Sequence, residues 1–135
     1  MAKDALEFRH KTPQFDGPKK TWQVCQSDLM KVQVQVVKDG GENNLHTHTG
    51  EDAFWYVIRG AVRFYGEGDK EIGVYQKGEG LLVPRGFKYW FESASSEELE
   101  VLRVTAKDQN VDNKRVDLAP QKDWMIQQKT FSTQP

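Results

Sequence analysis

The chain has 135 residues, which fits one domain, and a domain of this size buries enough apolar surface to fold without disulfides or a structural metal. Its 19 Lys and Arg against 20 Asp and Glu leave a net charge of −1, which argues against a dedicated nucleic-acid-binding protein. A single cysteine, Cys25, excludes an internal disulfide and a multi-cysteine zinc module. No apolar run reaches the ~20 residues of a membrane span, and no signal-peptide pattern is present. We therefore expect a soluble, cytoplasmic protein with no nucleic-acid or membrane partner.

Residues 1–29 carry scattered apolar positions in a polar background, and we expect an arm that lies across the domain with one or two short strands. From residue 30 onwards the pattern is that of a β protein. Residues 30–37 alternate apolar and polar side chains, which predicts a strand with one buried face, whereas the aromatic and β-branched run at 53–58 predicts a strand buried on both faces.

Further strands are expected at 45–48, 61–65, 70–75, 81–83, 87–91 and 99–105, with glycine-rich or polar turns between them. Strands spaced every 8–12 residues or so, without a helical period, indicate an all-β sandwich or barrel. The polar extension at residues 106–135 contains one apolar cluster, Trp124-Met125-Ile126, which would dock on the barrel or on a partner subunit. Residues 130–135 are expected to fray.

Two histidines, His46 and His48, are the sharpest chemical feature of the sequence. Because they are two residues apart on an extended segment, both side chains should point to the same face, roughly 6.5–7 Å apart. Neutral imidazole is the commonest side-chain ligand of divalent transition metals. The pair alone is compatible with a metal site and also with ordinary surface or hydrogen-bonded histidines.

The surroundings of this pair resemble the first motif of the cupin superfamily, and a stretch some thirty residues later resembles the second. The positions that carry the resemblance are Gly40, His46, His48, Gly60, Gly78, Pro84 and Gly86. It spans roughly residues 30–105 and implies an all-β double-stranded β-helix, or jelly-roll barrel. Residues 1–29 would then be an N-terminal arm that packs on this barrel and residues 106–135 a C-terminal extension.

The ligand positions of the family are only half kept. Metal-binding cupins take two histidines and a glutamate from the first motif and one more histidine from the second. His46 and His48 match the first two, but the glutamate position falls on Ala53 and the last histidine position on Tyr89. Asp52, at a junction of turn and strand, is therefore a candidate third ligand.

Glu51 is the other candidate for the missing carboxylate, although it lies one residue further away from the family position. Tyr89 would present a neutral hydroxyl to a ligand or to a metal-bound water, or would simply be an aromatic residue of the pocket wall. Strand alternation points Trp55, Val57, Phe87 and Phe91 inward as well. Together these side chains predict a mostly apolar small-molecule pocket, or ordinary barrel core.

The first functional hypothesis is a metal-dependent cupin enzyme. His46 and His48 would hold Fe, Mn, Ni or Zn, Asp52 or water would complete the shell, and Tyr89 and Asp52 would transfer protons. The substrate would be a small aromatic, polyketide-like or sugar molecule, and the chemistry that of an oxygenase, an isomerase or cyclase, or a lyase. The alternatives are a cupin that binds or senses a small molecule without turnover, its metal weakly bound or absent, and a metal-free epimerase-like cupin. In the last, His46 or His48 is the base and Tyr89 the acid.

A homodimer is expected, because cupins commonly pair through sheet faces or exchanged N-terminal strands. Alternation directs Phe54, Tyr56 and Trp90 to the outside of the barrel. These apolar side chains would be exposed there unless a partner subunit covered them. Two arginines near the pocket strands, Arg63 and Arg85, are expected to be solvated surface residues rather than anion ligands.

Overall fold

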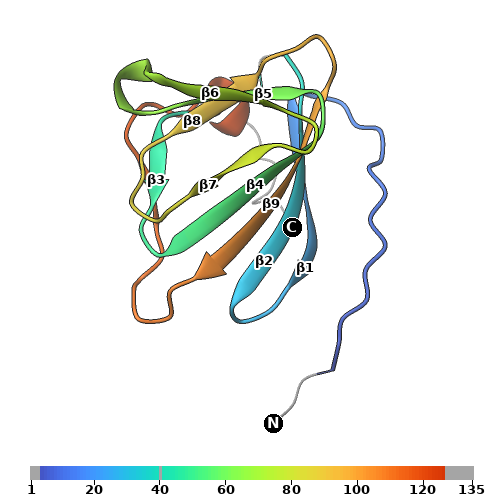
Figure 1. The fold of residues 1–135 in the computed structure, drawn as a ribbon, viewed down its shortest axis with the longest axis vertical. Helices are drawn as coiled ribbons and strands as arrows, with labels where there is room; N and C mark the ends of the chain where they lie inside the picture. Colours follow the sequence, from blue (N-terminus) through green and yellow to red (C-terminus); the bar gives the residue numbers. More distant parts are fainter. Residues whose placement is uncertain (1–3, 40, 127–135) are drawn as a thin grey trace.

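The computed structural model describes residues 4–39 and 41–126. Ten strands, one 3-10 turn and a short helical turn at residues 123–126 make up its regular structure (Figure 1). In chain order the strands and the 3-10 turn are β1 (Lys19–Gln26), β2 (Met30–Val37), β3 (His46–His48), β4 (Glu51–Arg59), β5 (Ala61–Tyr65), η1 (Glu67–Asp69), β6 (Glu71–Gln76), β7 (Gly80–Val83), β8 (Trp90–Ser93), β9 (Leu99–Lys107) and β10 (Arg115–Asp117). The all-β prediction is confirmed.

Two antiparallel layers enclose the interior of the barrel. The larger is a five-stranded sheet in the order β1-β2-β9-β4-β7, and the smaller is a three-stranded sheet in the order β6-β5-β8 (Figure 1). Gly60 alone separates β4 from β5 and adopts a φ of 79° in the tight turn that carries the chain from one sheet to the other. This non-local antiparallel pairing is the jelly-roll arrangement expected from the sequence.

A two-stranded ribbon of β3 and β10 extends the smaller sheet. His46 forms an isolated bridge with Tyr89: the amide of each residue donates a hydrogen bond to the carbonyl of the other, at 3.1 and 3.0 Å. This bridge places the histidine strand directly beside the start of β8. It therefore aligns the two motif regions that the sequence analysis singled out.

The apolar core lies between the two sheets. Its largest fully buried side chains are aromatic, and they pack on one another with ring centroids about 5–6 Å apart, a separation typical of aromatic pairs in protein cores. The residues of this cluster are Val37, Ala53, Trp55, Val57, Val62, Phe64, Val83, Tyr89, Phe91, Leu99 and Val101. The strand run at 53–58 is buried on one face only, because Phe54 and Tyr56 are exposed on the other.

Both flanks of the chain take part in the sheets. The region expected to be an arm contributes β1, an eight-residue strand that pairs with β2 along its whole length, and the C-terminal extension contributes β10. Trp124 docks on the barrel, where its indole N–H donates a 2.9 Å hydrogen bond to the carbonyl of Glu42. The fraying expected at residues 130–135 lies outside the described residues. Within the described ranges, the structure contains no helix long and apolar enough to span a membrane.

Candidate functional site

A small polar cavity of about 230 Å³ lies inside the barrel, between the edges formed by β1 and β10. Its wall takes side chains from both sheets and from the β3-β10 ribbon, and most of them are polar or charged. The lining residues are Lys19, Thr21, Gln33, Gln35, Asn43, His46, His48, Trp55, Tyr89, Phe91, Arg103 and Arg115. Cavities that hold drug-sized ligands have ~300–1,000 Å³, so this one suits a smaller molecule.

His46 is a buried, neutral imidazole. Its Nδ1 lies 2.7 Å from the backbone carbonyl of Asn44, and since a carbonyl can only accept, Nδ1 carries the proton and Nε2 keeps its lone pair. Burial, together with the nearby Arg115 guanidinium, lowers the pKa of His46 to about 3. The ring is therefore uncharged throughout the physiological pH range and offers an acceptor or a proton-accepting nitrogen.

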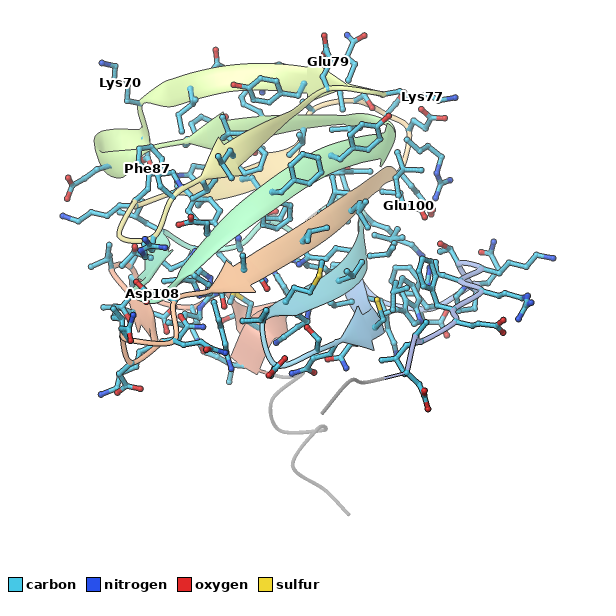
Figure 2. The ribbon with its side chains drawn as sticks, turned by 60° about the horizontal axis from the view of Figure 1, so that its bottom comes forward. Lys70, Lys77, Glu79, Phe87, Glu100 and Asp108 are labelled. Atoms are coloured by element: carbon cyan, nitrogen blue, oxygen red, sulfur yellow. The ribbon has the colours of Figure 1, made fainter. Side chains whose placement is uncertain are left out.

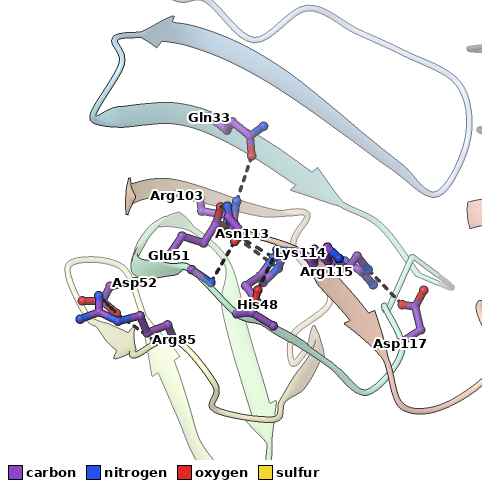
Figure 3. Close-up of polar contacts among 12 residues, drawn as sticks. Gln33, His48, Glu51, Asp52, Arg85, Arg103, Asn113, Lys114, Arg115 and Asp117 are labelled. Atoms are coloured by element: carbon purple, nitrogen blue, oxygen red, sulfur yellow. Dashed lines mark hydrogen bonds and ion pairs between the residues drawn. The ribbon is translucent and has the colours of Figure 1, made fainter. Parts of the chain in front are cut away.

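Arg103 connects His48 to Glu51 (Figure 3). The guanidinium Nη2 donates to Glu51 Oε2 at 2.6 Å and lies 3.5 Å from His48 Nε2. Because a guanidinium can only donate, Nε2 is the unprotonated nitrogen of the His48 ring. Burial and the charge of Arg103 lower the pKa of His48 to about 4, although Glu51 opposes the shift. His48 is thus a second neutral imidazole, with its lone pair directed at a cation.

Glu51 is an ionised carboxylate fixed by two donors. Besides the contact with Arg103, its Oε1 accepts a 2.7 Å hydrogen bond from the Asn113 side chain. Burial alone would raise the Glu51 pKa, but the guanidinium and the Asn113 hydrogen bond outweigh it and hold that pKa below its usual range. Both oxygens of this carboxylate are therefore already satisfied by the protein.

Tyr89 completes the histidine side of the cavity. Its ring centroid lies 4.5 Å from that of His46, and the side chain is almost fully buried. Burial raises the pKa of the phenol, so the group remains a neutral hydroxyl that can donate or accept a hydrogen bond. A phenolate ligand for a metal is accordingly not what this environment favours.

Two more cations face the cavity from its open side. Arg115 is held by Asp117 at 3.0 Å and by the side-chain oxygen of Asn44 at 2.7 Å. Lys19 is nearly buried, and burial with the charges of Arg115 and Arg103 lowers its pKa to about 7. Three cationic side chains thus line the cavity, and two of them pair with carboxylates, Arg103 with Glu51 and Arg115 with Asp117.

The predicted site residues divide into two groups. His46, His48, Tyr89, Trp55 and Phe91 all line the cavity. Val57 packs in the apolar core and is not among the lining residues.

Asp52 and Phe87 lie away from the cavity. The structure does not bring Asp52 to the histidines, because its carboxylate accepts hydrogen bonds from the backbone N–H and the guanidinium of Arg85 (Figure 3). Phe87 is 39% exposed at the periphery of the molecule (Figure 2), so the inward position expected for it is not found. It follows the turn at residues 84–86 and precedes β8, so strand alternation does not extend back to it.

The mostly apolar pocket expected from the sequence is instead polar and cationic, because sequence reasoning missed Lys19, Arg103 and Arg115. A signal for Arg103 was present: it occupies the inward phase of β9, in step with the buried Leu99 and Val101. A charged residue on the buried face of a strand marks a functional or ion-paired position. No comparable pattern identifies Lys19 or Arg115, whose positions depend on how the flanking strands pair.

The residues present do not fit a resident divalent metal held by protein side chains. His46 offers a lone pair, but that of His48 is directed at Arg103, and both Glu51 oxygens are occupied. The three cationic side chains in the wall further disfavour a bound cation. In the described part of the chain, no three His, Cys, Asp or Glu side chains are arranged to hold a metal ion.

Comparisons with known proteins agree with this fold. The family model described as "Cupin domain" matches residues 33–105. A Klebsiella pneumoniae protein with a double-stranded beta-helix domain superimposes with a TM-score of 0.65 at 17% identity, covering 78% of this chain and 90% of that one. KdgF from Halomonas sp. superimposes with a TM-score of 0.61 at 16% identity, covering 75% of this chain and 91% of that one.

An RmlC-like cupin from Desulfovibrio desulfuricans is 26% identical, with a TM-score of 0.56 over 65% of this chain and 81% of that one. No curated protein matches the sequence at a significant level. The family model covers more than half of the chain, including β3, β4 and the second motif region. The protein belongs to the cupin family.

Proposed function

We propose that this cupin binds a small organic anion, most simply a carboxylate, in the cavity between its two sheets. The observation that carries the proposal is the convergence of Lys19, Arg103 and Arg115 on one small cavity. Guanidinium groups pair with carboxylates through parallel N–H donors, and such charge-assisted bonds are stronger than neutral ones. These cationic side chains match a ligand that carries negative charge.

The rest of the wall provides neutral polar groups around the charged centre. Gln35 Oε1 and Trp55 Nε1 are buried without a hydrogen-bond partner among the described residues, and both side chains belong to the lining. Buried polar groups are normally paired, so unpaired ones in a cavity wall are consistent with a ligand or ordered water that pairs with them. A polar ligand therefore suits the cavity better than the aromatic or polyketide-like molecule expected from the sequence.

Arg115 is the best residue with which to test this function. Its carboxylate partner Asp117 is about one-third exposed and can be solvated when Arg115 is removed, and a glutamine amide keeps a donor for the buried Asn44 oxygen. Removal of Arg103, by contrast, would strand the buried Glu51. We expect Arg115→Gln to weaken binding of small carboxylates by tenfold or more, since a hydrogen bond to a charged group contributes ~1.5–3 kcal/mol. Isothermal titration calorimetry with a panel of small carboxylates and their uncharged amides measures this.

Arg63→Gln is the matched control, because Arg63 pairs with Glu71 and Glu92 on the surface of the smaller sheet. It should leave affinity unchanged. Equal binding of carboxylates and amides, or equal losses in the two arginine variants, would contradict the proposal.

A second candidate function is metal-free proton transfer on the bound anion. It is favoured by the neutral ring of His46, whose unprotonated Nε2 lies in the same wall as the Tyr89 hydroxyl. One group can accept a proton while the other donates one, as general acid–base catalysis requires. Exchange of solvent deuterium into an acidic C–H of a bound oxo acid, followed by NMR, tests this step, and it should disappear in both His46→Asn and Tyr89→Phe. Persistence of exchange in these variants would rule out this role.

A further inference from the structure

Lys19 occupies an unusual position for a lysine. It is the first residue of β1, pairs with Val37, and its side chain lines the cavity while only 9% of its surface is exposed. The amino nitrogen lies 4.9 Å from the centroid of the Phe91 ring and 5.3 Å from that of Trp124. Two aromatic rings thus exclude much of the water that would normally solvate an ammonium group.

Charged groups around this amine favour its neutral form. Arg103 from β9 and Arg115 from β10 line the same cavity, and His46 from β3 faces it as an uncharged ring. Burial and the two guanidinium charges lower the pKa of Lys19 to about 7, so the neutral amine is accessible near neutral pH. Attraction of an ammonium to the two ring faces acts in the opposite direction.

An unprotonated amine in a desolvated, cationic cavity is the setting in which lysines act as nucleophiles. We propose that Lys19 forms an imine with the carbonyl group of a small oxo acid bound in the cavity. The inference rests on the proposed function, since Arg103 and Arg115 would hold the carboxylate of that acid while its carbonyl carbon meets the lysine nitrogen.

The chemistry balances without an oxidant or reductant. The nitrogen lone pair of Lys19 attacks the carbonyl carbon, the C=O π pair moves to oxygen, and a proton passes from nitrogen to that oxygen to give a carbinolamine. Loss of water, assisted by a second proton on the departing oxygen, forms the C=N bond. Hydrolysis reverses both steps. The wall residues His46 and Tyr89 are placed to accept and return these protons.

The experiment is reductive trapping. The protein is incubated with pyruvate, or separately with acetoacetate, and sodium borohydride is added to reduce any imine to a stable secondary amine. Peptide mass mapping then locates the adduct. We expect near-stoichiometric labelling of Lys19 by at least one of the two acids, with labelling that rises through pH 7 as the amine loses its proton. The neighbouring Lys20, which is exposed, is the internal control and should remain unlabelled.

Lys19→Arg removes the nucleophile, so it should abolish the adduct. Binding is measured separately on the unaltered protein with propionate, which has a carboxylate but no oxo group. Since the labelling map of the unaltered protein is decisive by itself, a variant that fails to fold does not leave the question open. Labelling spread over surface lysines, including Lys20, would overturn the inference. Calorimetric binding of propionate and both oxo acids without an adduct would overturn the imine alone, whereas the absence of any binding would overturn the proposed function as well.

Discussion

The Glu51 carboxylate accepts a 2.6 Å hydrogen bond from the Arg103 guanidinium, and both side chains are about nine-tenths buried. This pair lies where a metal-binding cupin would need an unoccupied carboxylate beside its histidines. By engaging Glu51 and facing His48, Arg103 converts a set of three candidate metal ligands into a fixed network of hydrogen bonds (Figure 3). This network is consistent with our proposal that the cavity binds an anion and not a metal ion.

Loss of Arg103 should destabilise the protein strongly. Arg103→Met leaves the Glu51 carboxylate buried and without its cation, a change that costs about 3–5 kcal/mol when one partner of a buried ion pair is removed. Chemical denaturation, followed by tryptophan fluorescence, measures the free energy of unfolding. Combining Arg103→Met with Glu51→Gln removes the stranded charge and should recover part of the loss.

The exposed pair Arg63–Glu71 provides the comparison, since its side chains are 36% and 53% exposed. Arg63→Met should cost at most about 1 kcal/mol, the range measured for surface ion pairs. If the two arginine variants were equally stable, the interpretation of Arg103 as the centre of the network would be wrong.

The framework of the fold was predictable because strand alternation is a local property of the chain. The predicted bounds of β2 and β5 match the structure, and the aromatic run of β4 turned the expected residues inward. Phe87 was misplaced since the turn before it interrupts the alternation. In β2 the polar side chains face the barrel interior, the reverse of the usual arrangement for an alternating strand. Gln33 and Gln35 line the cavity, whereas Val34 and Val36 are buried on the opposite face.

The character of the site was less predictable because it depends on contacts between distant segments. Glu51, not Asp52, meets Arg103, since the inward phase of β4 begins at Glu51 and includes Ala53 and Trp55. The ionic environment of His46 requires β10, which pairs with β3 across more than sixty residues of sequence. No local pattern in the sequence reveals that pairing.

The metal content of the protein tests whether Arg103 prevents the histidines and Glu51 from binding a metal ion. Protein purified without a histidine tag or a chelating column should contain well below one equivalent of transition metal by elemental analysis. Arg103→Met frees Glu51 and the lone pair of His48, which together with His46 make a two-histidine, one-carboxylate set. Zinc affinity should then rise at least tenfold, and a further His48→Gln change should abolish the gain.

One tightly bound equivalent of metal in the unaltered protein, retained after dialysis against a chelator, would contradict our interpretation of the cavity. So would an Arg103→Met variant that is folded, as judged by circular dichroism, and has no greater affinity for zinc.

Stability should fall on acidification because His46 is buried as a neutral ring. Its pKa of about 3 in the folded protein lies below the ordinary value of 6.5, so the unfolded chain takes up a proton that the folded protein does not. The contribution of this group is fully present above pH 6.5 and is lost as the pH falls toward 3. At pH 5 the loss would reach about 2 kcal/mol.

Denaturant titrations of the unaltered protein and of His46→Asn at pH 7 and pH 5 measure this contribution. The amide of the variant can still donate to the Asn44 carbonyl but has no proton to gain, so its pH dependence should be weaker. An identical slope in the unaltered protein and in His46→Asn would contradict the assignment.

The outer face of the five-stranded sheet predicts a homodimer. Phe54 on β4 and Leu82 on β7 are paired across the sheet and are 45% and 64% exposed, and Tyr56 stacks beside Phe54 with its ring nearly parallel. Val104 and Leu102 on β9 continue the same two cross-strand rows on the other side of β4. Contiguous apolar surface of this kind on a sheet commonly marks a protein–protein interface, and a second copy would cover it symmetrically.

Light scattering coupled to size-exclusion chromatography should give a dimer mass at micromolar concentration. Leu82→Lys places an unpaired charge on that interface and should shift the mass to that of a monomer. Ile72 on β6, in the other sheet, is also exposed and apolar, so Ile72→Lys is the matched control and should remain dimeric. A monomer mass for the unaltered protein would contradict the predicted homodimer. Dissociation by both lysine variants alike would instead mean that the contact does not lie on the β4–β7 face.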